Sequence, residues 1–379
     1  MHARIGWQNL RTSEFLDSGN YMLITGTDFN DGAINFSTCH YVERERYEQD
    51  RNIQIHNGSI LITKDGTLGK VAYVQGLSMP ATLNAGVFNV QIKDANNVDE
   101  KYLFQYLKAP FLMDYVDKKA TGGTIKHLNQ SILVDFPVIL PQRSEQTLIG
   151  AFFQQLDNLI TLHQRKYEKL KSMKAALLEK IFPSENETTP KIRFKGFTEA
   201  WEQRKNEDIG ICFSGGMLSY ASLSDTGQYK CVLYGDLYTQ YDTTIFKIDR
   251  RTNQKGNTIY KNDILFPQST TVDAYSLISP ACLNEKIAET SGVFVIRPSK
   301  NIDGNFVAYY SKGNEKQRNK LAKKAQGLTI VHLYYQSIKN ETILIPSLIE
   351  QKKISSLLIK LDNLITLHQR KQYIKLTKP

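Results

Sequence analysis

Residue types that suit contact with nucleic acid gather in residues 64–70, which read KDGTLGK. Lysine reaches phosphate oxygens and guanine edges, a threonine hydroxyl bonds to either, and glycine allows close backbone approach. We predict Lys64, Thr67 and Lys70 as DNA contacts, with an ordinary β-turn bearing exposed lysines as the alternative. A phosphate-binding P-loop is not expected, because Gly69-Lys70 follows Gly66 too closely and Val71 replaces serine or threonine.

Polar residues stand at the corresponding place later in the chain. Gln268, Ser269 and Thr270 follow an apolar run, and glutamine can pair with adenine through two hydrogen bonds. Cationic side chains that suit phosphate contact lie on either side of this position. They are Arg250 and Arg251, and Lys320, Lys323 and Lys324 in the basic run 316–324. The alternative for the lysine run is a solvated helix face.

A third candidate stretch occurs in both halves of the chain. Residues 121–127 read TGGTIKH, and Gly327, Thr329 and His332 repeat part of the pattern. Repetition favours a shared backbone or phosphate contact over the reading of different bases, and a folding role is the alternative. The residues predicted here are Thr124, Lys126 and His127.

The candidates belong to two blocks, each followed by the same segment. Residues 156–166 and 361–371 both read LDNLITLHQRK, and the match extends upstream to Glu145-Gln146 and Glu350-Gln351. A repeat of this length predicts two homologous halves.

Both copies are predicted to be long helices, because their apolar residues alternate in the 4-3 spacing of a heptad seam. Pro141 and Pro346 precede the helices and mark their starts. The first, from about residue 144 to 182, would be about 58 Å long at ~1.5 Å per residue, with one break in the seam at Lys174. The seam residues are Ile149, Phe153, Leu156, Ile160, His163, Tyr167 and Leu170 in the first helix and Ile354, Leu358, Leu361, Ile365 and His368 in the second.

The two seam histidines have no second ligand placed nearby. We therefore expect them to fix the register of the helices rather than to bind metal.

The two blocks repeat each other in outline. Short β-like runs alternate with turn signals in both, and Gly86-Val87-Phe88 recurs as Gly292-Val293-Phe294. We predict an α+β protein of two homologous α/β domains joined by two long helices. The segments are a first domain at 1–142, a helix at 143–182, a linker at 183–200, a second domain at 201–346 and a shorter helix at 347–379.

Composition and charge favour a protein that binds nucleic acid over a membrane-spanning or secreted protein. The net charge is +10, and the excess lies in the helices and the second block, which agrees with a nucleic-acid partner. No apolar run approaches the ~20 residues that span a membrane, and the N-terminus lacks the apolar core of a signal peptide. Four isolated cysteines indicate reduced thiols in the cytoplasm.

The chain resembles the specificity subunit of type I restriction-modification systems. Three features carry the resemblance: the LPxxxEQ signal ending in Glu145-Gln146, the duplicated LDNLITLHQRK helix, and RFKGFTEAWEQRK at 193–205. The resemblance implies two target-recognition domains and two antiparallel helices that form a coiled-coil spacer. The target would be double-stranded DNA with an asymmetric bipartite sequence, one half-site per domain.

The resemblance also implies partners and excludes catalysis by this chain. Two modification (methyltransferase) subunits and restriction (translocase and nuclease) subunits are expected as partners. S-adenosylmethionine, ATP and Mg²⁺ are expected on those partners and no cofactor on this chain. Compared with the family pattern, the opening of the first domain looks shortened. The second helix diverges after Lys371 and should be at least about two turns shorter at ~3.6 residues per turn.

Two other functions stay open from the residues alone. One is a duplicated coiled-coil adaptor that binds proteins, and the other is a self-contained nuclease. The sequence contains no Asn-Pro-Pro-aromatic methylation motif, no Gly-rich cofactor loop and no HExxH zinc motif. We therefore predict no catalytic residue and no metal ligand.

Overall fold

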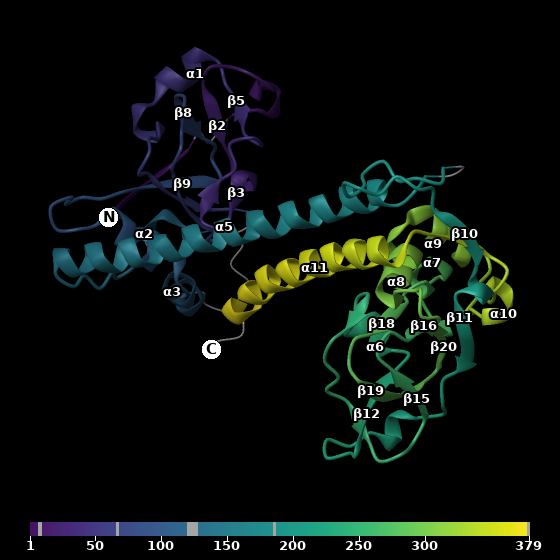
Figure 1. Ribbon diagram of the computed structural model, residues 1–379. Helices are drawn as coiled ribbons and strands as arrows, with labels where there is room; N and C mark the ends of the chain where they lie inside the picture. Colours follow the sequence, from purple (N-terminus) through teal and green to yellow (C-terminus); the bar gives the residue numbers. More distant parts are fainter. Residues whose placement is uncertain (7–9, 66–67, 120–127, 185–186, 377–379) are drawn as a thin grey trace. The chain divides into compact units, whose positions relative to one another are not determined.

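The computed structural model describes all residues except 7–9, 66–67, 120–127, 185–186 and 377–379 (Figure 1). It divides into two compact units, Met1–Thr161 and Leu162–Pro379. The boundary falls inside α5 (Arg143–Ile181), the helix that carries the first copy of the repeat. Each unit combines sheets with helices, so the predicted α+β class is confirmed.

The first unit is built on a four-stranded sheet of order β1-β9-β6-β7 and a three-stranded sheet of order β5-β2-β8. Its strands are β1 (His2–Ile5), β2 (Met22–Ile24), β3 (Phe29–Asn30), β4 (Ala33–Ile34), β5 (His40–Tyr41), β6 (Ile60–Thr63), β7 (Val71–Tyr73), β8 (Ala81–Leu83) and β9 (Val87–Gln91). Its helices before α5 are α1 (Arg44–Gln49), α2 (Glu100–Lys108), α3 (Phe111–Lys119) and α4 (Gln130–Asp135).

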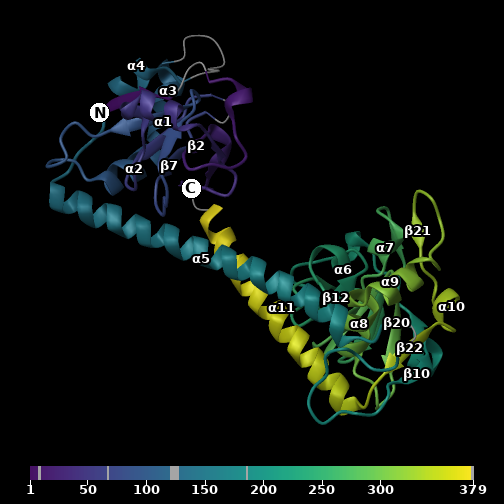
Figure 2. The same ribbon diagram turned by 90° about the horizontal axis from the view of Figure 1, so that it is seen from above.

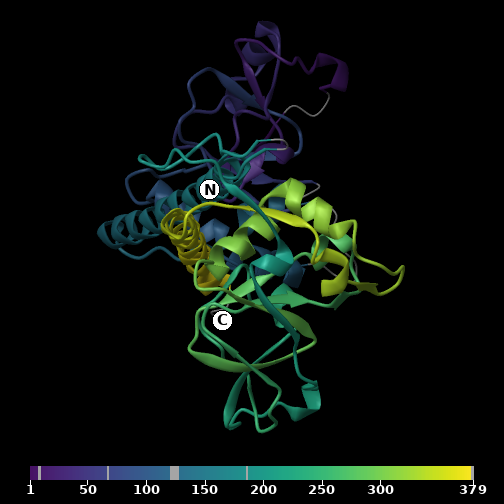
Figure 3. The same cartoon turned by 45° about the vertical axis from the view of Figure 1, so that its right-hand side comes forward.

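The second unit has a five-stranded sheet of order β11-β20-β16-β18-β13 and a four-stranded sheet of order β14-β12-β19-β15. Its strands are β10 (Glu202–Lys205), β11 (Gly210–Ser214), β12 (Tyr229–Leu233), β13 (Thr244–Ile245), β14 (Arg251–Thr252), β15 (Asn257–Tyr260), β16 (Ile264–Pro267), β17 (Ser269–Thr270), β18 (Ala281–Leu283), β19 (Ile287–Ser291), β20 (Val293–Pro298), β21 (Val331–His332) and β22 (Thr342–Ile345). Its helices are α6 (Asp236–Thr239), α7 (Ala274–Leu277), α8 (Gly304–Gly313), α9 (Glu315–Ala322), α10 (Tyr335–Ile338) and α11 (Leu348–Leu376). Helix α8 lies between α11 and the five-stranded sheet and contacts both (Figure 3).

Strand pairing shows that the two domains are copies of one scaffold. In the first, β6 pairs antiparallel with β9, with Ile60 opposite Val90. In the second, β16 pairs antiparallel with β20, with Ile264 opposite Ile296. Each domain also has a parallel pair at the equivalent place, β2 with β8 and β12 with β19. The duplication predicted from the repeated sequence is therefore confirmed.

A buried glutamine joins each long helix to its domain. In the first domain Gln146 Oε1 accepts a hydrogen bond from the backbone N–H of Asp99 at 2.9 Å. Its Nε2 donates to the carbonyl oxygens of Asn97 at 2.9 Å and Pro141 at 2.8 Å. In this way one side chain ties the loop before α2, the loop before α5 and α5 itself together.

The second domain repeats this joint atom for atom. Gln351 Oε1 accepts from the N–H of Asp303 at 2.9 Å. Its Nε2 donates to the carbonyl oxygens of Asn301 at 3.1 Å and Pro346 at 2.8 Å. Both Gln146 and Gln351 are 1% exposed, so their bonds are made out of reach of water, where a missing partner is costly.

The aspartates that meet these glutamines cap the next helix. Asp99 accepts from the N–H groups of Lys101 and Tyr102 at the start of α2, and Asp303 accepts from that of Asn305 in α8. Their second carboxylate oxygens face the long helices, where Ser355 donates to Asp303 at 2.6 Å. The pKa of Asp99 is lowered, because backbone N–H groups and Arg143 outweigh the effect of burial.

Helices α5 and α11 run antiparallel within the second unit (Figure 2). His163 Nδ1 lies 3.0 Å from His368 Nδ1, and Lys174 pairs with Asp362. Further along, Ile181 shares a core with Ile354 and Leu358. The antiparallel pair is therefore confirmed. Helix α11 has 29 residues and α5 has 39.

Burial varies along the seam. Ile354 and Leu358 are fully buried, while Leu361, Ile365 and His368 are half-buried, as are Ile149, Ile160, His163, Tyr167 and Leu170. Phe153 and Leu156, expected in the core, are 45% and 36% exposed. The physical reason is that residues 177–182 and 192–194 cover the start of α11, and these residues belong to the second unit.

We expect Gln351→Ala to lower the free energy of unfolding of the second unit by about 1–3 kcal/mol, because it leaves the buried N–H of Asp303 without an acceptor. Gln164→Ala, on the exposed face of α5, is the control and should change it by less than about 0.5 kcal/mol. Denaturant unfolding measures both. Equal effects would contradict the structural role of the joint.

Candidate nucleic-acid interface

The stretch that differs most between the two scaffolds follows β6 in one domain and β16 in the other. In the first it connects the paired strands β6 and β7, and Gly69 and Lys70 donate backbone N–H bonds to Thr63. Gly69 has φ +74, and a Cβ there would lie 2.2 Å from Met113 Sδ, so glycine is required. Lys70 is exposed and Lys64 is half-exposed, whereas Thr67 lies outside the described residues.

In the second domain the same stretch makes strand β17 and helix α7. Ser269 and Thr270 pair with His332 and Val331 of β21, and Asp273 caps α7 by accepting from the N–H of Ser276 at 2.7 Å. Gln268 precedes the strand and is half-buried. Equivalent parts of one scaffold therefore carry loops of different conformation and chemistry.

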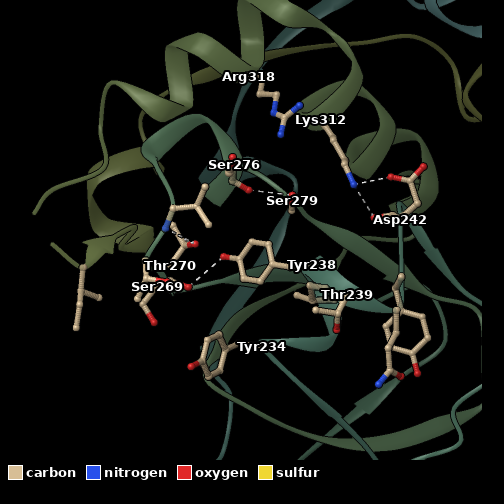
Figure 4. A pocket seen from close by; sticks show the side chains of 16 residues that line it. Tyr234, Tyr238, Thr239, Asp242, Ser269, Thr270, Ser276, Ser279, Lys312 and Arg318 are labelled. Atoms are coloured by element: carbon tan, nitrogen blue, oxygen red, sulfur yellow. Dashed lines mark hydrogen bonds and ion pairs between the residues drawn. The ribbon is translucent and has the colours of Figure 1, made fainter. Parts of the chain in front are cut away.

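A cleft of about 800 Å³ opens beside this loop (Figure 4). Tyr238 crosses it, and its hydroxyl donates to the carbonyl oxygen of Ser269 at 3.1 Å. Burial raises the pKa of Tyr238, so the hydroxyl stays a neutral donor. The lining residues are Tyr234, Leu237, Tyr238, Thr239, Gln240, Tyr241, Asp242, Ser269, Thr270, Thr271, Val272, Ser276, Ser279, Lys312, Arg318 and Ile330.

The cleft offers the groups that recognise nucleic acid. Gln240, Ser269 and Thr271 supply donors and acceptors that match base edges. Arg318 supplies a guanidinium, which stacks on the Tyr275 ring 3.9 Å from its centroid and donates to the Tyr275 carbonyl oxygen at 3.1 Å. Such fixed cations suit phosphate contact. Sequence reasoning singled out Ser269, Thr270 and the basic run 316–324 that contains Arg318. It missed Gln240, which only the tertiary fold brings beside them.

The cleft is linked to the long helices through charged side chains. Lys312 Nζ lies 2.5 Å from Asp242, and Lys174 Nζ of α5 lies 3.2 Å from the same carboxylate. Lys174 also lies 2.5 Å from Asp362 of α11, which accepts from the Tyr309 hydroxyl at 2.6 Å. Lys174, which interrupts the heptad seam of α5, therefore forms ion pairs with both the second domain and α11.

The cationic candidates of the second domain are mostly engaged within it. Arg250 Nε lies 2.7 Å from the buried carboxylate of Asp236, and Arg251 donates to the carbonyl oxygen of Gly227 at 2.7 Å. Lys320 and Lys324 both pair with Glu341, whose pKa they lower. Lys323 is exposed. Their predicted contacts with phosphate stay predictions.

The third candidate stretch is described by the structure in its second copy, residues 327–332. There Gln326 and His332 exchange two backbone hydrogen bonds, at 2.8 and 2.7 Å, that close a hairpin. Gly327 has φ +118, and a Cβ there would lie 2.0 Å from the Ile330 carbonyl oxygen. Gly327 is therefore required by the backbone of this hairpin. Thr124, Lys126 and His127 lie outside the described residues.

The described residues were also searched for a metal site, reactive thiols and a membrane-spanning helix. They contain no cluster of three or more His, Cys, Asp or Glu side chains that could hold a metal ion. Cys39, Cys231 and Cys282 are buried free thiols, and burial raises the pKa of Cys39 to about 12. No helix in the described ranges is long and apolar enough to cross a membrane.

Comparison with known proteins decides the family. The sequence model of the type I restriction modification DNA specificity domain matches residues 7–172 and again residues 198–378. The chain belongs to this family. Each match contains one mixed α and β domain and one copy of the long helix, so the family unit is present twice.

Individual relatives agree with this assignment. The MjaVIII specificity subunit, a type I restriction enzyme subunit of Methanocaldococcus jannaschii, is 24% identical over 85% of this chain and 76% of its own length. The putative MjaX specificity subunit of the same organism is 25% identical over 94% of this chain and 84% of its own length. The crystal structure of the type I restriction-modification S subunit from M. genitalium shares the fold, with a TM-score of 0.59 at 14% identity over 97% of this chain and 88% of that one.

We expect Lys174→Met to lower the free energy of unfolding of this specificity-family protein by about 1–3 kcal/mol at pH 7, because it removes the cation that Asp242 and Asp362 share. Lys312 and Lys174 outweigh desolvation and lower the pKa of Asp242 to about 2. Ion pairing of Asp242 therefore stabilises the fold above its ordinary pKa, and this contribution is lost as the pH falls toward 2.

The difference between wild type and Lys174→Met should accordingly shrink between about pH 4 and pH 2, the range between the ordinary pKa and the lowered one. Lys171→Met, at an exposed position on the same helix, is the control. Denaturant titrations over this pH range measure the effect. A difference that stays constant with pH would contradict the ion-pair assignment.

Proposed function

We propose that this chain is the DNA sequence-specificity subunit of a type I restriction-modification complex and reads an asymmetric bipartite target. The observation that carries the proposal is one scaffold present twice, each time with the same glutamine joint to a long helix and with different loops beside the same strand. Identical support with divergent loops suits two readers of different half-sites.

Each domain would contact its half-site through the loop that differs. In the second domain this is the cleft beside β17, with polar groups that match base edges and Arg318 for phosphate. In the first domain it is the β6–β7 hairpin with Lys64 and Lys70. The first domain, acidic overall, would bind through this local patch rather than through a general positive field.

The helices would set the separation and offer the assembly surface. Leu159 and Leu162 are 52% and 46% exposed, and their counterparts in the second copy, Leu364 and Leu367, are 44% and 50% exposed. Similar exposure of the same leucines in both copies fits a surface used twice, by two modification subunits.

The remaining reaction components would belong to the partners. Adenine methylation with S-adenosylmethionine would be performed by the modification subunits. Translocation and cleavage with ATP and Mg²⁺ would be performed by the restriction subunits. The chain itself would be non-catalytic and, with DNA as its ligand, would work in the cytoplasm.

Replacing residues 201–346 by the second domain of a relative should change one half-site of the methylated motif and leave the other unchanged. The test is adenine-methylation mapping in a methylation-free host that expresses the chimera with its modification subunit. The unmodified chain is the control. A change in both half-sites would contradict independent reading.

Within the cleft, Gln240→Ala should relax discrimination at one base pair of the second half-site by about 1–3 kcal/mol. Arg318→Ala should weaken binding to all sequences and reduce its salt dependence, as loss of a phosphate contact does. Gln203→Ala and Arg204→Ala, on β10 away from the cleft, are the matched controls. Binding of the assembled complex to oligonucleotides varied at each position measures both effects, and indistinguishable variants and controls would place the reading surface elsewhere.

A further inference from the structure

A short segment covers the start of α11, and no equivalent segment covers the start of α5 among the residues that the structure describes. Arg193 forms two hydrogen bonds to the Glu350 carboxylate, 2.7 Å from Nε and 2.9 Å from Nη2. Phe194 packs against the core that contains Ile354 and Leu358. Phe197 lies under the Lys353 ammonium, 4.9 Å from the ring centroid. Residues 192–197, IRFKGF, therefore cover one face of α11.

The turn within this cover depends on one glycine. Gly196 has φ +94, a conformation that side-chain-bearing residues rarely adopt. The backbone N–H of Ile192 donates to the carbonyl oxygen of Lys180 at 2.9 Å, which anchors the segment to the end of α5. An arginine, an aromatic, a glycine turn and a second aromatic thus form one recognition unit.

The corresponding face of α5 keeps the acceptor residues. Glu145 stands where α11 has Glu350, next to the joint glutamine in both helices, and Ile149 and Phe153 stand where α11 has Ile354 and Leu358. We call Glu145, Leu148, Ile149, Phe152 and Phe153 the α5 face. Its carboxylate and apolar side chains match the chemistry that Arg193 and Phe194 meet on α11.

Exposure separates the two faces sharply. Phe153 is 45% exposed whereas its counterpart Leu358 is 0% exposed, and Ile149 is half-buried whereas its counterpart Ile354 is 1% exposed. Beside them on α5, Leu148 and Phe152 are 73% and 58% exposed. Glu350 is 1% exposed, and Glu145 is exposed. Because the leucines at 159, 162, 364 and 367 are similarly exposed in both copies, this difference is confined to the part of the helix that IRFKGF covers on α11.

We propose that the α5 face is a docking site for a partner segment of Arg-Phe-x-Gly-Phe chemistry, whose guanidinium pairs with Glu145 and whose aromatic rings cover Phe152 and Phe153. A folded second copy of this chain is not the occupant, because its own Arg193 is held by a carboxylate that is 1% exposed. The occupant carries an additional segment of this kind. This site rests on the internal repeat and does not depend on DNA recognition.

The probe is a fluorescent peptide of residues 188–201, TTPKIRFKGFTEAW, added to the full chain and followed by fluorescence anisotropy. The peptide should bind, and Glu145→Gln should weaken binding about tenfold or more, as expected for loss of a charge-assisted hydrogen-bonded pair. Phe153→Ser should also weaken it. Glu168→Gln, at an exposed acidic position on the same helix, is the control and should leave binding unchanged.

Three outcomes would overturn the proposal. The first is that no binding is seen at 1 mM peptide. A Kd of 1 mM corresponds to a binding free energy of only about −4 kcal/mol. The second is equal binding by Glu145→Gln and Glu168→Gln, as would occur if the peptide only exchanged with residues 188–201 on α11. The third is a dimer of the free chain, seen by sedimentation, that Arg193→Ala dissolves, which would make a second copy the occupant.

Discussion

The structure depends on a glutamine side chain buried at the start of each long helix. Gln146 and Gln351 each connect three backbone groups from segments that are distant in sequence. An amide side chain can both accept and donate without carrying a charge into the interior, where a charge would be expensive. Loss of this amide would leave a buried N–H and two carbonyl oxygens without partners. Helix and domain therefore behave as one piece, and this rigidity is what a reader held at a fixed place on a helix requires.

Around this fixed joint, other parts of the two copies have diverged. The strands next to the joint keep the same pairing and register, while the stretch beyond β6 or β16 forms a hairpin in one copy and a strand and helix in the other. A strand in the middle of a sheet cannot shift by one residue without exposing its buried face. A loop at its end carries no such restriction. This explains why the paired strands are the same in the two copies while the loops at their ends differ.

Sequence reasoning succeeded where a pattern repeats along the chain. The 4-3 spacing and the duplicated LDNLITLHQRK predicted both helices, and their antiparallel pairing is confirmed at His163 and His368. It failed where the outcome depends on contacts across the fold. Phe153 and Leu156 have seam spacing but are exposed, because spacing says which residues share a face and not what covers that face.

The candidate site shows the same limit. Ser269 and Thr270 were identified by their place after a strand, but Gln240 and Arg318 are brought beside them only by tertiary structure. Residue type alone also could not show that Arg250 faces a buried Asp236, or that Lys174 interrupts the seam in order to pair with Asp242 and Asp362. The Glu-Gln repeat was visible in the sequence, yet two of the three hydrogen-bond partners of each glutamine lie 47 to 50 residues away.

The central claim is that the two domains determine which bases are recognised. The helix between them determines the length of the unread gap. The most direct test inserts seven residues between Thr161 and Leu162, where the two compact units meet, so that each unit keeps its internal contacts. Seven residues add about 10 Å at ~1.5 Å per residue with almost no rotation, which corresponds to about three base pairs at ~3.4 Å each. Methylation mapping should then give both half-sites unchanged and a gap longer by about three base pairs. An altered half-site, or an unchanged gap in an active complex, would contradict the account.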